Sequence, residues 1–152
     1  MMTTANRILF ATDFSEISSN AFDEAIKLSK MLGAELVIAN VLHYPPILSD
    51  LRAQAEEIET AMKQWCTHRL DQLAANARSA GIKAETVLRE GAVVHSGILA
   101  IAEEFGTIMI VLGTHGRTGL SKLVIGSVAA RVITEATCPV VTVRSKIARR
   151  AP

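Results

Sequence analysis

The feature that most constrains the fold is a regular alternation of short apolar runs with longer segments of helical periodicity. The apolar runs predict five strands, at residues 6–12, 35–42, 82–90, 107–112 and 139–143. Four helices are predicted between them, from an N-cap at Asp13 to Gly33, over 50–80, from the turn at Gly91 to about Phe105, and over 127–136. Strands that alternate with helices predict an α/β domain with three layers: a doubly wound, five-stranded parallel sheet with helices on both faces.

The start of the first helix is predicted from a local capping pattern. Asp13 precedes Glu16 by three residues, which is the spacing of a capping box, and the apolar positions from Ile17 onward recur at helical spacing. Two roles stay open for Asp13: a helix cap alone, or a cap that also contacts a ligand.

Composition favours one folded domain. The chain has 152 residues, of which 49% are hydrophobic, and a mean hydropathy of +0.30, which excludes a largely disordered chain. We expect a single domain over 1–146 and a basic tail over 147–152.

No apolar run approaches the length of about 20 residues that crosses a bilayer, and the N-terminus lacks the apolar stretch of a signal peptide. The two cysteines, Cys66 and Cys138, lack metal-ligand spacing. A cytoplasmic protein without a membrane span is the expectation.

Charge is distributed unevenly along the chain. Residues 1–106 contain 9 Lys and Arg and 14 Asp and Glu, whereas residues 107–152 contain 7 and 1, although the formal net charge is only +1. A total so close to zero argues against a dedicated nucleic-acid binder. A small ligand that carries phosphate fits the local excess of cations better.

A long glycine-containing loop follows the fourth predicted strand. It runs from Gly113 to Ile125, includes Arg117 and Lys122, and leads to Gly126 and Ser127, where a helix is predicted to begin. Glycines let backbone amides approach an anion, and a helix N-terminus adds unpaired donors. The alternative is that the glycines only make turns and the cations are only solvated. The spacing is neither that of a P-loop nor that of a Rossmann fingerprint.

Ligands of doubly wound sheets bind beyond the carboxyl ends of the strands, where the strand order reverses. A site is therefore expected among four windows that follow predicted strands: residues 11–14, 41–44, 91–95 and 113 onward.

Several motifs resemble those of the universal stress protein family, in particular its ATP-binding branch. The similar segments are Ile8 to Ser15, Ala34 to Leu36, Val111 to Gly119 and Gly126 to Val141, with glycines spaced G-x2-G-x9-G and then Ser127. The resemblance implies a fold like that of the adenine nucleotide alpha hydrolases and an ATP ligand, with magnesium bridging phosphate oxygens. It implies that the nucleotide is bound by Ala11, Thr12, Asp13, Val41, Leu112, Gly113, His115, Gly116, Arg117, Gly126, Ser127 and Val128.

The resemblance further implies a stress-response regulator that acts as a nucleotide-dependent homodimer on an unidentified regulatory protein partner. The dimer would form through the last strand, Val140 to Val143, whose β-branched residues suit a sheet edge. Two alternatives stay open. One is a slow ATPase or autophosphorylating enzyme that uses a Ser or Thr of the loop, and the other is a nucleotide-free interaction module. No residue is assigned as catalytic, because no carboxylate or nucleophile lies near His115 in the sequence.

Overall fold

Five parallel strands form one sheet in the order β3-β2-β1-β4-β5 in a computed structural model that describes residues 5–44, 52–115 and 125–145. The strands are β1 (Arg7–Ala11), β2 (Glu35–Leu42), β3 (Ala84–Glu90), β4 (Met109–Gly113) and β5 (Val140–Val143). The sheet confirms the predicted α/β class. It also places β5 at an edge, as the sequence predicted.

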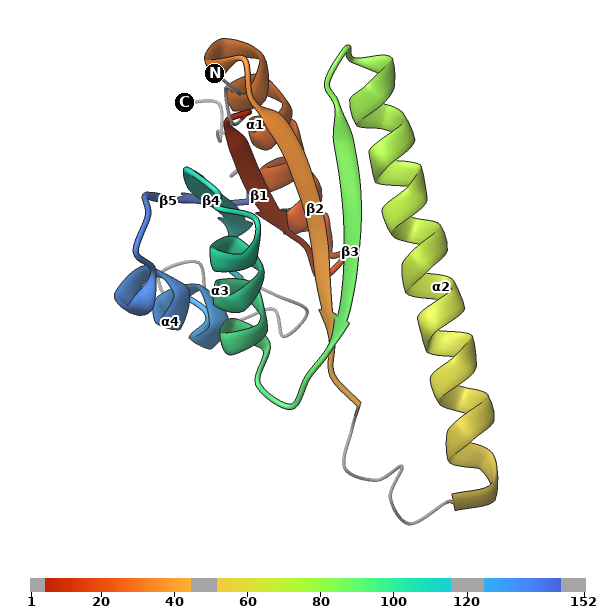
Figure 1. Cartoon of the computed structure of the whole chain (residues 1–152). Coiled ribbons are helices and arrows are strands. Elements are labelled where there is room, and N and C mark those ends of the chain that lie inside the picture. Colours follow the sequence, from red (N-terminus) through yellow and green to blue (C-terminus); the bar gives the residue numbers. More distant parts are fainter. Residues whose placement is uncertain (1–4, 45–51, 116–124, 146–152) are drawn as a thin grey trace, which may run out of the picture.

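Four helices cover the two faces of the sheet (Figure 1). The helices α1 (Glu16–Leu32) and α2 (Arg52–Ser79) pack on one face, and α3 (Val94–Glu104) and α4 (Ser127–Glu135) pack on the other. The result is the three-layer arrangement predicted from the alternation of elements. None of the described helices combines the length and apolarity that a membrane crossing requires.

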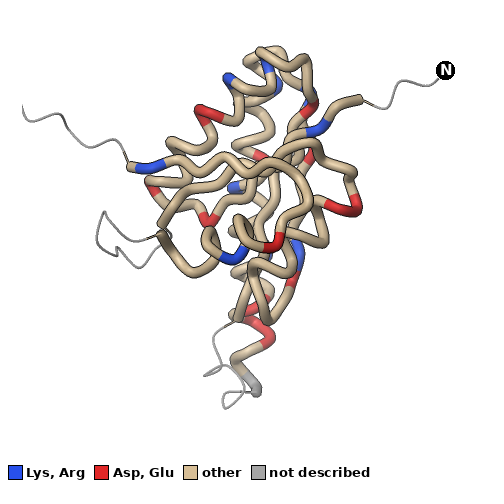
Figure 2. The backbone as a smooth tube through the Cα atoms, turned by 90° about the vertical axis from the view of Figure 1, so that its left-hand side faces the viewer, with Lys and Arg blue, Asp and Glu red and all other residues tan. Residues whose placement is uncertain are grey.

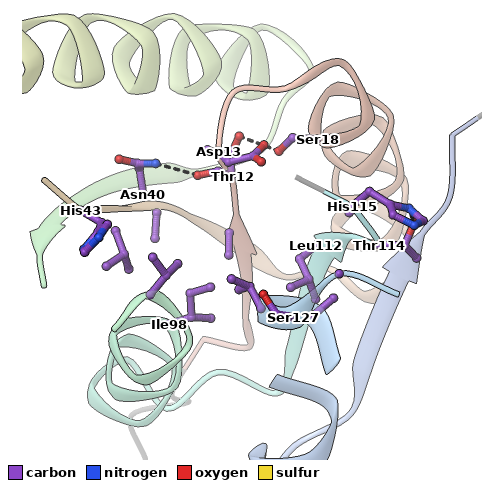
Figure 3. Close-up of a pocket in the computed structure, with 18 residues that line it drawn as sticks. Thr12, Asp13, Ser18, Asn40, His43, Ile98, Leu112, Thr114, His115 and Ser127 are labelled. Atoms are coloured by element: carbon purple, nitrogen blue, oxygen red, sulfur yellow. Dashed lines mark hydrogen bonds between the residues drawn. The ribbon is translucent and has the colours of Figure 1, made fainter. Parts of the chain in front are cut away.

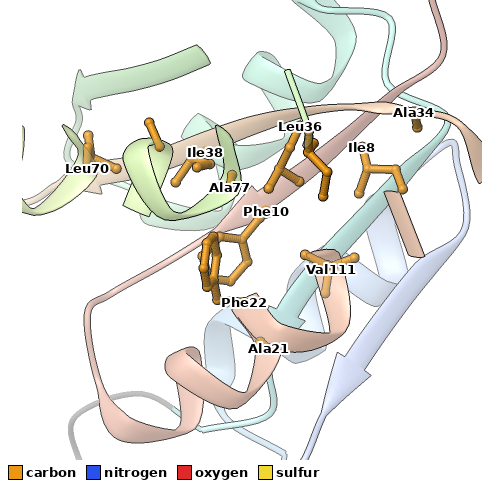
Figure 4. Close-up of a cluster of buried hydrophobic side chains, with 13 residues drawn as sticks. Ile8, Phe10, Ala21, Phe22, Ala34, Leu36, Ile38, Leu70, Ala77 and Val111 are labelled. Atoms are coloured by element: carbon orange, nitrogen blue, oxygen red, sulfur yellow. The ribbon is translucent and has the colours of Figure 1, made fainter. Parts of the chain in front are cut away.

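Each face of the sheet has its own hydrophobic core. On the α1 and α2 side, the rings of Phe10 and Phe22 lie 5.4 Å apart, among buried side chains that include Leu36 and Leu70 (Figure 4). On the α3 and α4 side, Ile101 and other aliphatic residues pack against the opposite face of the same strands. Because both faces of β1 and β2 are covered, these strands are apolar almost throughout rather than alternating.

The capping prediction for Asp13 is wrong. The N-cap of α1 is Ser15, whose side chain accepts a hydrogen bond from the amide of Ser18. Asp13 instead accepts from the amide of Ser15 at 3.0 Å, within the turn that precedes the helix. The reason is the backbone of Phe14, which adopts a φ of 63° and turns the chain between Asp13 and the helix.

The end of the preceding helix determines where β2 and β4 begin. Gly33 ends α1 in the left-handed conformation, as predicted, and β2 follows with its expected bounds. After α3, Gly106 has a φ of 58° and the amide of Thr107 donates to the carbonyl of Ala102. Thr107 therefore belongs to the helix end, and β4 begins at Met109 rather than at Thr107. The predicted start of α2 near residue 50 lies outside the described residues.

Charged residues of both signs are interspersed over the described chain (Figure 2). The uneven charge that the sequence indicated rests largely on residues outside the described ranges: Arg117, Lys122, Lys146, Arg149 and Arg150.

Candidate functional site

A pocket of about 470 Å³ lies at the carboxyl ends of β1, β2 and β4 (Figure 3). β1 is the strand at which the order reverses, because the chain leaves it toward β2 on one side and returns to β4 on the other. The volume is within the usual range for small-molecule sites, about 300–1,000 Å³.

Ten of the twelve residues predicted to bind nucleotide line this pocket: Ala11, Thr12, Asp13, Val41, Leu112, Gly113, His115, Gly126, Ser127 and Val128. The fold thus brings together four segments that are far apart in the sequence. Gly116 and Arg117, the other two, lie outside the described residues, as do Thr118 and Ser121, two of the loop hydroxyl residues that the autophosphorylation alternative would use.

One end of the pocket is an aliphatic wall. β2 contributes Ala39 and Val41, α3 contributes Val94 and Ile98, and β4 contributes Leu112. Val41, Ile98 and Leu112 are each more than nine-tenths buried. A wall of this kind, without charged groups, suits a flat, weakly polar ring system.

The turn between β1 and α1 forms a hydrogen-bonded polar rim. The hydroxyl groups of Thr12 and Ser18 lie 2.6 Å apart, and the Thr12 hydroxyl also accepts from the amide of Phe14 at 3.0 Å. The side-chain amide of Asn40, at the end of β2, donates to the Thr12 carbonyl at 2.8 Å. These bonds fix the turn that carries Asp13 at the pocket edge (Figure 3).

The N-terminus of α4 opens into the pocket from another side. Gly126 is the N-cap and supplies no side-chain hydrogen bond, and the first turn contains no acidic residue. Gly126, Ser127, Val128 and Ala129 all line the pocket. A helix start with this sequence leaves its first backbone amides, and the positive end of the helix dipole, for an anion.

Two histidines lie on opposite sides of the pocket (Figure 3). The Nδ1 atom of His43 is 3.4 Å from the carbonyl oxygen of Gly91, and the Nδ1 atom of His115 is 2.9 Å from the Thr114 hydroxyl.

Formal charge is sparse among the described lining residues. Asp13 is the sole carboxylate among them, and none of them is Lys or Arg. Within the described ranges, no cluster of three or more His, Cys, Asp or Glu residues could hold a metal ion. An anion in the described part of the pocket would therefore be stabilised mainly by backbone dipoles.

Eight lining residues were not predicted from the sequence as site residues: Ser18, Ala39, Asn40, His43, Val94, Ile98, Thr114 and Ala129. His43, Val94 and Thr114 fall within the windows expected from the strand ends. The periodicity of strand and helix could have found Ala39, two residues before Val41, and Ile98, four residues after Val94. Nothing comparable marks Ser18 or Asn40, whose positions depend on the geometry of the turn.

A family model for the universal stress protein family matches residues 4–144. The chain belongs to the universal stress protein family. Among curated members, universal stress protein MJ0531 of Methanocaldococcus jannaschii is 35% identical over 140 residues, which cover 91% of this chain and 81% of that protein.

Solved structures of this family share the fold. Protein MJ0577, from the same archaeon, superposes with a TM-score of 0.83 at 24% identity, covering 95% of this chain and 99% of the other. A universal stress protein from Archaeoglobus fulgidus, solved in complex with dAMP, gives a TM-score of 0.66 at 22% identity, covering 93% and 99% of the two chains.

Proposed function

We propose that this universal stress protein binds ATP in the pocket and acts as a nucleotide-dependent regulator in the cytoplasm. The observation that carries the proposal is the pairing of an aliphatic wall with an uncapped helix N-terminus in one pocket. The wall suits an adenine ring, and the amides of α4 suit phosphates. The dAMP complex of the Archaeoglobus fulgidus relative supports an adenine nucleotide as the ligand class.

The proposed orientation follows from the positions of these two ends. The adenine would lie against Val41, the ribose beside the turn that holds Asp13, and the phosphates at Gly126, Ser127 and Val128. The predicted residues Gly116 and Arg117 would complete the phosphate end.

Magnesium fits this arrangement as an ion carried by the nucleotide. Asp13 is the sole carboxylate among the described lining residues, and Mg²⁺ is often bound by one or two carboxylates together with substrate phosphates. The ion would neutralise phosphate charge. The residues of this chain would bind the nucleotide and orient it.

Calorimetric titration of the nucleotide-stripped protein tests the proposal. We expect ATP with Mg²⁺ to bind more tightly than GTP, and Gly126→Val to abolish binding, because a side chain there would block the approach of phosphate to the amides of α4. Ala130→Val, at an exposed position of the same helix, is the matched control and should bind like wild type. Absence of binding by the wild-type protein at millimolar ATP would refute the proposal.

A homodimer through β5 is the second part of the proposal. The carbonyls of Pro139 and Val143 accept hydrogen bonds from the β4 side, so alternation along a parallel strand points the amides of Val140 and Thr142 outward. An edge with free amides can pair with a second copy.

The oligomeric state can be measured by light scattering after size exclusion. Thr142→Pro removes one outward amide, and proline is tolerated on edge strands, so we expect this variant to be a monomer while Thr142→Val stays dimeric. A wild-type monomer, with or without ATP, would contradict the dimer.

A further inference from the structure

Gly97 occupies an unusual position for a glycine, inside α3. It has no positive φ that would require glycine, and glycine lowers the stability of a helix interior relative to alanine. The reason for its presence therefore lies outside the helix backbone.

The neighbour that requires a glycine is Val41. A Cβ atom at position 97 would lie 2.8 Å and 2.9 Å from the two γ carbons of Val41, closer than real Cβ contacts allow. Val41 lies near the end of β2, an inner strand whose backbone pairs with β3 at Arg89. Its position is therefore held by the sheet.

Gly97 and Val41 face each other across the boundary between α3 and β2, and both of these elements contribute to the aliphatic wall of the pocket. Val41 lines the pocket from β2, and Val94 and Ile98, on either side of Gly97 in α3, line it from the helix. Ile98 and Ile101 anchor α3 in the core, with 5% and 0% of their surfaces exposed. A side chain at position 97 must therefore push Val41 into the pocket or push α3, with its lining residues, away from the sheet.

We propose that Gly97, acting through Val41, sets the width of the slot that receives the nucleotide base. It is a positioning residue, because it acts on the base through Val41 and does not itself line the pocket. This inference rests on the proposed binding of an adenine nucleotide with its base against Val41. Gly97 would thereby make the aliphatic wall selective for a flat ring. It would not affect the binding of phosphates at the N-terminus of α4.

A comparison of two glycines and three ligands tests the inference. Gly97→Ala introduces the close contact, and Gly91→Ala is the matched control, because a Cβ there would lie 3.6 Å from Val41, an ordinary van der Waals distance. Each full-length variant is titrated calorimetrically with ATP, with adenosine and with inorganic tripolyphosphate, and its thermal unfolding is recorded.

We expect Gly97→Ala to weaken ATP and adenosine alike by about tenfold and to leave tripolyphosphate binding unchanged, as overpacking at the base slot implies. Gly91→Ala should stay within about twofold of wild type for all three ligands. Adding Val41→Ala to Gly97→Ala removes the clashing γ carbons, and the double variant should bind ATP as Val41→Ala alone does.

Three results would overturn the inference. In the first, wild type binds ATP and Gly97→Ala binds it equally well. In the second, Gly97→Ala weakens tripolyphosphate as much as adenosine, which would indicate a general disturbance of the fold. In the third, wild type binds neither ATP nor adenosine. This result would refute the proposed function and, because the inference depends on it, the role of Gly97 as well.

Discussion

Ser127→Asp separates the stability of α4 from its capacity to bind phosphate. The substitution places a carboxylate in the first turn of a helix that has no acidic residue and no side-chain cap there. A carboxylate near a helix N-terminus stabilises by about 0.3–1 kcal/mol. For a domain of this size we therefore expect the melting temperature to rise by about 1–4 °C.

The same carboxylate should weaken nucleotide binding. Ser127 lines the pocket but is solvent-exposed, so an effective dielectric constant between about 20 and 80 applies. At a separation of about 5 Å, each pair of like charges then costs about 0.8–3 kcal/mol. Taking about 2 kcal/mol for the whole effect, ATP affinity should fall about 30-fold. The difference from wild type should shrink as salt is added, because exposed charges are screened.

Calorimetry and thermal unfolding on the same samples measure both effects. Ala130→Asp is the control, since it adds the same charge at an exposed position of α4 outside the pocket lining. The control should keep its affinity within about twofold of wild type. If Ser127→Asp bound ATP as tightly as wild type, the phosphates could not lie at the N-terminus of α4.

Three further predictions concern stability and are measured by urea unfolding. Thr12→Val should lower stability by about 2 kcal/mol, because the Ser18 hydroxyl and the Phe14 amide lose their partner; a change below about 0.5 kcal/mol would contradict this. Ser15→Ala should cost about 1 kcal/mol by removing the N-cap of α1, and Ser15→Asp should largely retain it; equal losses in both variants would count against the capping role. Tyr44→Phe should add about 1 kcal/mol near neutral pH, because the buried Tyr44 hydroxyl has no hydrogen-bond partner among the described residues. Burial also raises the pKa of the Tyr44 hydroxyl above its ordinary value of 10.0. The contribution of this group to the free energy of unfolding is therefore fully present below pH 10.0 and is lost as the pH rises through the raised pKa. Tyr44→Phe should make this alkaline loss less steep, and an unchanged slope would show that Tyr44 does not contribute to it.

The sequence predicted the elements well wherever local chemistry alone determines them. Glu35–Leu42 has its expected bounds because Gly33 ends the preceding helix and an uninterrupted apolar run follows. The order of elements then leaves few topologies, since crossovers between parallel strands are right-handed. Most of the pocket lining could be predicted from the residues that follow the strands, because the carboxyl ends of parallel strands meet at one edge of the sheet.

The sequence failed where tertiary geometry decides between local alternatives. Asp13 and Ser15 are both good N-caps, and the choice between them depends on the left-handed backbone of Phe14. This conformation cannot be predicted from the sequence, because phenylalanine rarely adopts it. Asn40 reaches the turn after β1 only because the register of β1 and β2 puts it there. Gly97 would be read in sequence as a weak point of a helix, and its contact with Val41 exists only in the folded chain.

In the proposed complex, one pocket holds both the base and the phosphates of an adenine nucleotide. Amide chemical shifts of ¹⁵N-labelled protein during titration with ATP and Mg²⁺ test it most directly. We expect the largest shifts at Thr12 and Val41 and at the first amides of α4, Ser127 to Ala129, all saturating with one affinity. Shifts confined to other surfaces, with these amides unmoved at saturating ATP, would contradict it.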